Sequence, residues 1–146
     1  MKAYIFSERL FVEAMLKNEW KNDVPSDSAV VSILYPGEKH FFKQKDNIIN
    51  LDFYDVNGYE VENVIGMTDN QAAELFNFIE DNVEKHFFVH CNAGASRSQA
   101  VAEFLKMFYN YDIESFSVVG RYPNQHVLRL LKSQYYIKYP DKFCYI

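Results

Sequence analysis

The 146-residue sequence has few of the features that mark secreted, membrane-spanning or nucleic-acid-binding proteins. Its two cysteines, Cys91 and Cys144, are too few for a disulfide framework, which predicts a reducing, cytoplasmic setting. No apolar run approaches the ~18 residues of a membrane span, and the apolar start at residues 1–6 is too short for a signal peptide. Lys and Arg (15) are fewer than Asp and Glu (20), so neither nucleic acid nor a membrane is an expected partner.

The net charge of −5 restricts how a phosphate-bearing ligand can be held. Because an acidic surface repels anions, such a ligand must be attracted by a few donors aimed at it. The length fits one domain, residues 1–146, and the 49% of hydrophobic residues is typical of a globular core. We expect a single domain that acts as a monomer.

Short apolar runs alternate with helical patterns along the chain. The apolar runs predict strands buried on both faces, at residues 3–6, 29–34, 48–54 and 87–90. Apolar residues at helical spacing predict four helices. The first follows Ser7 and the second follows Thr68 or Asp69, both residues that can cap a helix, while the third follows His90 and the fourth follows Pro123. Their apolar faces are, in order, Leu10, Phe11, Ala14 and Met15; Ala72, Leu75, Phe76, Ile79 and Val83; Val101, Phe104, Leu105 and Phe108; and Val127, Leu130 and Leu131. This alternation predicts an α/β fold, with a mostly parallel sheet of four or five strands flanked by helices. Ligands bind such sheets beyond the carboxyl ends of the strands.

One loop, residues 92–96, joins a predicted strand to a predicted helix and consists of small residues with Gly94 at its middle. Such a loop can turn successive backbone N–H groups inward, and the helix start adds donors and a partial positive charge. We expect this segment to bind an anion through Asn92, Ala93, Gly94, Ala95, Ser96 and Arg97.

Cys91 lies at the base of this loop and Arg97 closes it. A helix start and a neighbouring cation favour the ionised form of a thiol, which predicts a thiolate at Cys91. The planar guanidinium of Arg97 matches two phosphate oxygens, and a thiolate beneath a bound phosphate can attack phosphorus in line. A buried, inert cysteine is the alternative. The coincidence of His90, Gly94, Arg97 and Ser98 between a strand and a helix favours catalysis.

The pattern His90-Cys91-x-x-Gly94-x-x-Arg97-Ser98 resembles the phosphate loop of the protein tyrosine phosphatase superfamily, in particular its small dual-specificity branch. The resemblance implies that Cys91 is the nucleophile and that Arg97 and the loop amides bind phosphate and stabilise the transition state. It also implies that Ser98 hydrogen-bonds the thiolate, and that His90 orients the loop and helps to keep the cysteine ionised. No cofactor or metal is implied, and the four histidines, His40, His86, His90 and His126, are scattered along the sequence.

A second pattern, Pro123-Asn124-x-x-Val127-Leu128-x-x-Leu131, is similar to a segment that opens a late helix in dual-specificity phosphatases. His126 and Val127 stand where that segment has Gly and Phe. The similarity implies that Asn124 braces the phosphate loop, whereas a helix cap or turn is an equally good interpretation of Asn124. The two patterns together bring residues 48–138 into register with the family.

Members of the family protonate the leaving oxygen with an Asp on a loop upstream of the nucleophile. Asp52, Asp55 and Asp69 are the candidates here. Alternation places Asp52 inside a strand, and helix capping explains Asp69. Asp55 falls where the strand runs into a Gly-containing loop, the kind of place suited to a mobile acid, so we prefer it as the general acid. Glu60 and Glu62 in the same loop remain open.

The resemblance implies hydrolysis of phosphotyrosine, or of phosphoserine and phosphothreonine as well, in a phosphorylated protein or small phosphomonoester. The chain lacks the deep-pocket and Trp-Pro-Asp loops of the long tyrosine-specific enzymes, and its only Trp is Trp20. Its loop also lacks the Lys of phosphoinositide-directed relatives. The alternatives are a phosphopeptide-binding pseudophosphatase, a phosphatase of phosphoinositides or RNA 5′-phosphates, and a sulfur-transfer or arsenate-reducing enzyme. Cys144 is either a packing residue of the tail or a resolving thiol for Cys91.

Overall fold

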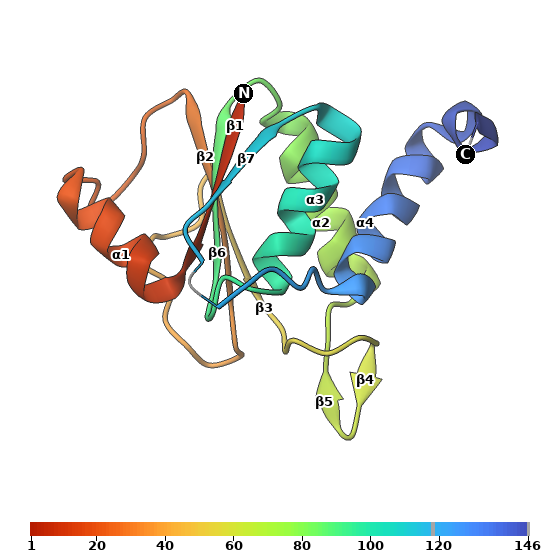
Figure 1. Ribbon diagram of the computed structural model, residues 1–146, viewed down its shortest axis with the longest axis horizontal. Helices are drawn as coiled ribbons and strands as arrows, with labels where there is room; N and C mark the ends of the chain where they lie inside the picture. The colour runs from red at the N-terminus through yellow and green to blue at the C-terminus, as the bar shows by residue number, and fades with distance from the viewer. Residues whose placement is uncertain (118, 146) are drawn as a thin grey trace.

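A five-stranded parallel sheet forms the centre of the computed structural model, with the strand order β3-β2-β6-β1-β7 (Figure 1). The structure describes residues 1–117 and 119–145, and the side chains of all of these except residues 143–145. Both roles considered for the Cys144 thiol therefore lie outside the described residues. The strands are β1 (Lys2–Ser7), β2 (Ser28–Leu34), β3 (Ile48–Asp52), β6 (His86–Cys91) and β7 (Asp112–Ser115).

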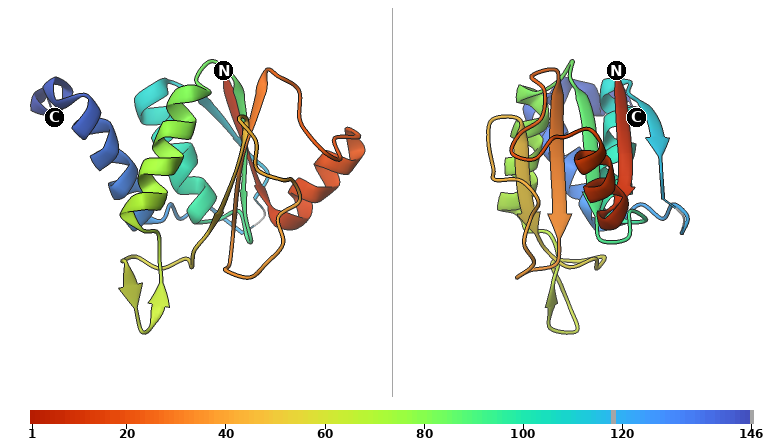
Figure 2. Two further views of the ribbon diagram at one scale, coloured as in Figure 1. Left: turned by 180° about the vertical axis from the view of Figure 1, so that it is seen from behind. Right: turned by 90° about the vertical axis from the view of Figure 1, so that its left-hand side faces the viewer.

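Every pairing within this sheet is parallel, and all seven residues of β2 are buried, as expected for a strand with helices on both faces (Figure 2). The predicted α/β class and mostly parallel sheet are confirmed, and the architecture is consistent with a phosphatase-like fold. Two details differ from the expectation. β3 ends at Asp52, two residues early, and the edge strand β7 was not predicted because its alternating polar residues leave no continuous apolar run.

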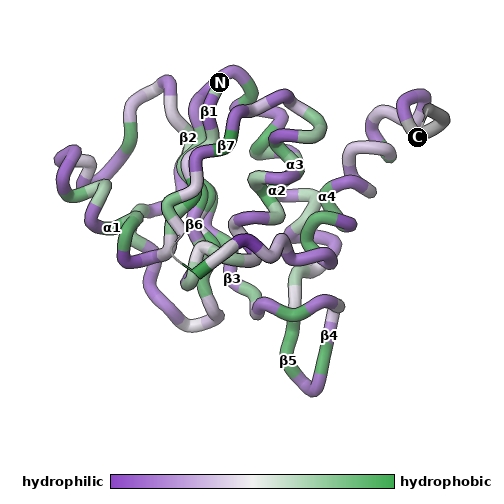
Figure 3. Tube along the Cα trace, in the orientation of Figure 1, coloured by the Kyte–Doolittle hydropathy of each residue, from purple (hydrophilic) through white to green (hydrophobic). Residues whose placement is uncertain are grey.

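Four α-helices flank the sheet in the described chain. Helix α1 (Glu8–Lys17) covers one face, whereas α2 (Asp69–Asp81), α3 (Arg97–Tyr109) and α4 (Gln125–Lys138) cover the other (Figures 1 and 2). A small hairpin of β4 (Glu60–Val61) and β5 (Val64–Ile65) follows β3, and a 3-10 helix, η1 (Pro140–Tyr145), follows α4. The hairpin carries apolar residues along an exposed loop (Figure 3).

The helix starts follow the predicted capping residues. The hydroxyl of Ser7 accepts the amide of Leu10 at the start of α1. At α2 the cap is Thr68, which forms a reciprocal capping box with Gln71. The expectation that Val83 continues the apolar face of α2 is wrong, because the helix ends at Asp81 and Val83 is 37% exposed.

Side chains of β6 alternate between the two layers of the core. Phe87, Val89 and Cys91 belong to the cluster packed under α2, α3 and α4. Phe88 and His90 point to the opposite side, toward α1. The two residues at the end of β6 therefore face different halves of the molecule.

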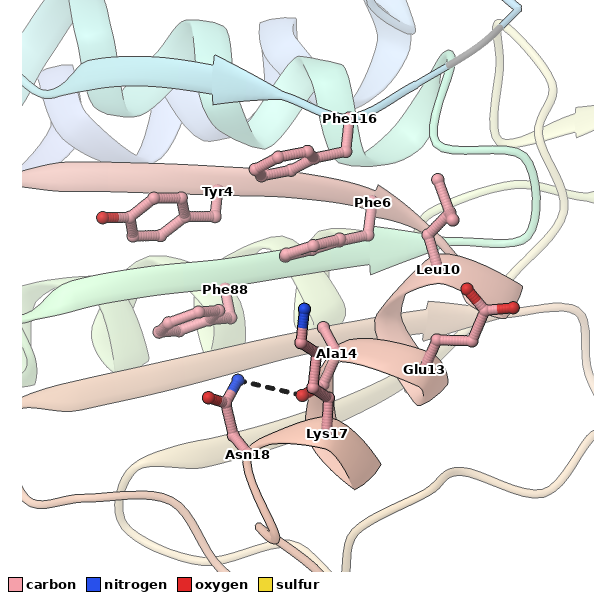
Figure 4. A pocket seen from close by; sticks show the side chains of 9 residues that line it. All are labelled: Tyr4, Phe6, Leu10, Glu13, Ala14, Lys17, Asn18, Phe88 and Phe116. Atoms are coloured by element: carbon pink, nitrogen blue, oxygen red, sulfur yellow. Dashed lines mark hydrogen bonds between the residues drawn. The ribbon is translucent and has the colours of Figure 1, made fainter.

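The α1 side of the sheet also carries a groove of about 480 Å³, bordered by Tyr4, Phe6, Phe88 and Phe116 (Figure 4). The rings of Phe6 and Phe116 stack with centroids 4.9 Å apart. Within the described residues, no helix is both long enough and apolar enough to span a membrane.

Candidate active site

The loop between Cys91, the last residue of β6, and Arg97, the first of α3, lies at the carboxyl end of the sheet. Gly94 lets this loop pack directly on the end of β1. Its φ of +73° is left-handed, and a Cβ there would lie 2.6 Å from the amide nitrogen of Ser7 and 2.7 Å from the carbonyl of Phe6. A glycine is thus required at this position by both conformation and space.

Backbone carbonyls of the loop are bonded on its outer side. The pairs are Asn92 O with the Glu8 amide (3.1 Å), Gly94 O with Gln99 Nε2 (2.9 Å), Ala95 O with the Tyr122 amide (2.7 Å) and Ser96 O with the Asn124 amide (3.0 Å). A planar trans peptide holds the next N–H on the side opposite its carbonyl. The amides of residues 93, 95, 96 and 97 consequently face the inside of the loop, an arrangement typical of anion-binding nests.

Cys91 lies at the floor of this nest and is only 2% exposed. Its sulfur is 3.1 Å from the hydroxyl oxygen of Ser98 and accepts the amide of Gly94 at 3.2 Å. Both groups can donate to a thiolate and stabilise its charge, as does the N-terminus of α3.

Arg97 is the largest fully buried side chain described, at 2% exposure. Its Nη1 donates to the carbonyl of Phe53 (2.7 Å), its Nη2 donates to Oδ1 of Asn92 (2.8 Å), and the ring of Tyr35 lies 4.4 Å from the guanidinium carbon. The third nitrogen, Nε, is buried without a hydrogen-bond partner. An unpaired buried donor on a cation is costly, and an anion bound in the adjacent loop would satisfy it.

Asp55 is brought to the edge of the loop by two hydrogen bonds. Its Oδ1 accepts the hydroxyl of Ser96 and Nδ2 of Asn124, both at 2.7 Å. Asn124 also caps α4 by accepting the amide of Val127 (2.9 Å). The bracing and capping interpretations of Asn124 are thus compatible, because one side-chain end donates and the other accepts.

The other acid candidates lie apart from these contacts. Asp52 is the exposed last residue of β3 and bonds to His40, and Asp69 accepts the hydroxyl of Tyr59 at the start of α2. Glu60 and Glu62 belong to the exposed hairpin. Among these candidates, Asp55 is the one with a hydrogen bond to a residue of the loop in the described structure.

His90 is buried on the α1 side, where its ring stacks on Phe11 with centroids 4.2 Å apart. Nε2 lies 2.7 Å from the hydroxyl of Ser32, and Nδ1 lies 3.4 Å from the carbonyl oxygen of Cys91. Burial lowers the pKa of His90 to about 3, although the hydrogen bond to the carbonyl acts in the opposite direction. His90 is therefore neutral and touches the nucleophile through the backbone.

Sequence reasoning missed three contributors to the site. Gln99 holds the Gly94 carbonyl outward, Phe53 supplies a carbonyl to Arg97, and Tyr35 covers the guanidinium. The polar side chain of Gln99, directly after Ser98 of the motif, was a sequence signal for the role of Gln99. The other two act through backbone or ring contacts that depend on how distant segments meet.

The described side chains include no group of three or more His, Cys, Asp or Glu that could hold a metal ion. No family model matches the sequence, and comparisons with curated proteins and with solved structures return no match either.

Proposed function

We propose that this protein is a phosphomonoester hydrolase that uses Cys91 as nucleophile and acts on phosphotyrosine or related aryl phosphates. The observation that carries the proposal is the buried, unpaired Nε of Arg97 beside a loop of inward amides. Three dianion oxygens would take their hydrogen bonds from these donors. The sulfur of Cys91 would then lie beneath phosphorus.

The proposed reaction has two steps. In the first, the thiolate of Cys91 forms an S–P bond while the P–O bond to the leaving group breaks, and the carboxylic acid of Asp55 gives its proton to the leaving oxygen. In the second, the Asp55 carboxylate takes a proton from water, the oxygen of that water bonds to phosphorus, and the S–P bond breaks. Inorganic phosphate leaves, and the hydroxyl of Ser98 stabilises the regenerated thiolate of Cys91.

Preference for an aryl ester rests on the surface beside Arg97. The rings of Tyr35 and Tyr54 lie 5.5 Å apart, and each is 38% exposed. They provide an aromatic wall next to the guanidinium, which suits the ring of a phosphotyrosine better than the short side chain of phosphoserine.

The test is turnover of an aryl phosphate such as p-nitrophenyl phosphate by wild type, Cys91→Ser and Cys144→Ser. Wild type and Cys144→Ser should release phosphate, also in EDTA, whereas Cys91→Ser should not. Binding of inorganic phosphate to wild type without any turnover would instead identify a pseudophosphatase. Peptides with phosphotyrosine and phosphoserine in the same sequence measure the expected preference for the aryl ester.

A further inference from the structure

Four side chains form a continuous chain of hydrogen bonds that ends at the backbone of the nucleophile. Oδ1 of Asp52 lies 2.5 Å from Nε2 of His40, and Nδ1 of His40 lies 2.7 Å from the hydroxyl of Ser32. The same hydroxyl lies 2.7 Å from Nε2 of His90, whose Nδ1 lies 3.4 Å from the carbonyl oxygen of Cys91. Residues scattered over β2, β3, β6 and the segment before β3 thus meet on the α1 side of the sheet.

The direction of every bond in this chain follows from its two ends. The carbonyl of Cys91 can only accept, so Nδ1 of His90 carries a proton, and Nε2 of the neutral ring accepts. Ser32 must therefore donate its single proton to His90. Toward His40 the hydroxyl oxygen is then an acceptor, and Nδ1 of His40 is a donor.

The other nitrogen of His40 faces a carboxylate oxygen, and two acceptors do not approach this closely without a proton between them. Imidazole binds a proton more tightly than a carboxylate, so the shared proton lies on His40. Both ring nitrogens are then protonated. The His40 side chain is 11% exposed and that of Asp52 46%, so the pair is shielded on the imidazolium side.

We propose that Asp52 and His40 are positioning residues of the candidate active site: a fixed imidazolium–carboxylate pair that sets the hydrogen-bond direction through Ser32 and His90 to the carbonyl of Cys91. The inference that this direction matters for turnover rests on the proposed function. The protonation of His40 does not.

The chain of hydrogen bonds affects the loop through the orientation of the peptide between Cys91 and Asn92. A bond from His90 holds the Cys91 carbonyl toward α1, and the trans peptide then turns the amide of Asn92 the opposite way. The Cys91 carbonyl joins the outward-bonded carbonyls of Asn92, Gly94, Ala95 and Ser96. The chain of hydrogen bonds thereby orients the amide of Asn92 at the start of the loop.

Charged groups surround the pair on several elements. A pocket of about 290 Å³ opens onto His40 and His90 and is bordered by Glu8 of α1 and by Lys39. Burial and the nearby charge of Glu38 raise the pKa of Glu8, whereas His40 acts in the opposite direction. The charges of His40 and of the Arg97 guanidinium both act to lower the pKa of His90. The charged group that is hydrogen-bonded to His40 is Asp52.

The protonation of His40 is measured by ¹⁵N–¹H correlation spectra of the imidazole rings at pH 7.5. His40 should show two protonated nitrogens, and His90 should show Nδ1 protonated and Nε2 free. His86, whose Nδ1 accepts the amide of Lys2 at 3.2 Å, provides the reference signal of an accepting ring nitrogen. In Asp52→Asn, His40 should lose the Nε2 proton. A neutral His40 in the wild type, or an unchanged His40 in Asp52→Asn, would overturn the proposed pair.

The positioning role is tested with Ser32→Ala, which interrupts the chain of hydrogen bonds between His40 and His90. We expect a loss in kcat/KM for p-nitrophenyl phosphate of about tenfold or more, the scale seen when a supporting hydrogen bond of a site is removed. The His90 spectrum should change with it, because its Nε2 then lacks a donor. The matched control is Ser28→Ala, which removes another buried hydroxyl from β2, bonded to Asp27.

The control should keep wild-type turnover and the wild-type His90 spectrum. Equal turnover in the wild type and Ser32→Ala, with a folded protein in both, would overturn the positioning role. Should the wild type itself hydrolyse no aryl phosphate, the proposed function fails, while the spectra still decide the protonation of His40.

Discussion

The hydroxyl oxygen of Ser98 lies 3.1 Å from the sulfur of Cys91, and both groups are buried. Ser98 is the second residue of α3, so the helix that supplies positive potential to the sulfur also delivers this donor. A hydroxyl in this place stabilises negative charge on sulfur. In the proposed reaction, sulfur gains that charge when the phosphocysteine breaks down.

Ser98→Ala should therefore slow the second step of the proposed reaction more than the first. Rapid mixing with p-nitrophenyl phosphate should show a burst of nitrophenol about equal to the enzyme concentration, followed by slow turnover. Thr in place of Ser98 keeps a hydroxyl and serves as the control. A uniform loss without any burst would contradict the assignment of Ser98 to breakdown of the intermediate.

Asp55→Asn should lower kcat by roughly 10²–10⁴, the usual contribution of a general acid. The amide keeps an oxygen that can accept from Ser96, so the loop contact is retained while the proton is lost. The defect should grow as the leaving group becomes more basic, which a series of substituted phenyl phosphates measures. Asp69→Asn is the control, since Asp69 bonds to Tyr59. A defect independent of the leaving group would remove Asp55 from the role.

Gly94→Ala should destabilise the protein by more than the same change at Gly37. Both glycines have positive φ, +73° and +91°, so each alanine costs about 1–2 kcal/mol in backbone conformation. At Gly37 nothing lies within 4 Å of the new Cβ, whereas at Gly94 backbone atoms of Phe6 and Ser7 lie within 2.7 Å. Urea unfolding measures the difference, which we expect to be about 1–3 kcal/mol, the usual cost of overpacking. Equal losses would show that the loop moves aside freely.

Acid should destabilise the protein through His90. Above its ordinary pKa of 6.5, the ring is neutral in both the folded and the unfolded chain. As the pH falls below 6.5, the His90 ring of the unfolded chain binds a proton, whereas the buried ring of the folded protein stays neutral down to about pH 3. The free energy of unfolding therefore decreases as the pH falls from 6.5 to about 3. The slope is at most about 1.4 kcal/mol per pH unit. Urea unfolding of wild type and His90→Gln between pH 7 and 4 should give a shallower slope for the variant, whatever its absolute stability.

The layer class and the place of the loop between a strand and a helix were readable from the sequence because they depend on local order. Small residues between a buried strand and a helix, with Cys91 before them and Arg97 after, favour an anion-binding loop. The sequence also placed Asp55 after its strand. Whether Asp55 acts as the acid stays a prediction, although the structure brings it to Ser96.

Tertiary structure alone decided which distant groups meet at the loop. The order β2-β6-β1 makes Ser32 the neighbour of His90 across two parallel strands, and this joins His40 and His90, which the sequence leaves 50 residues apart. Tyr35 and the carbonyl of Phe53 reach Arg97 in the same way. No local pattern encodes such contacts, because they follow from strand order and register, and these are set by burial of the whole sheet.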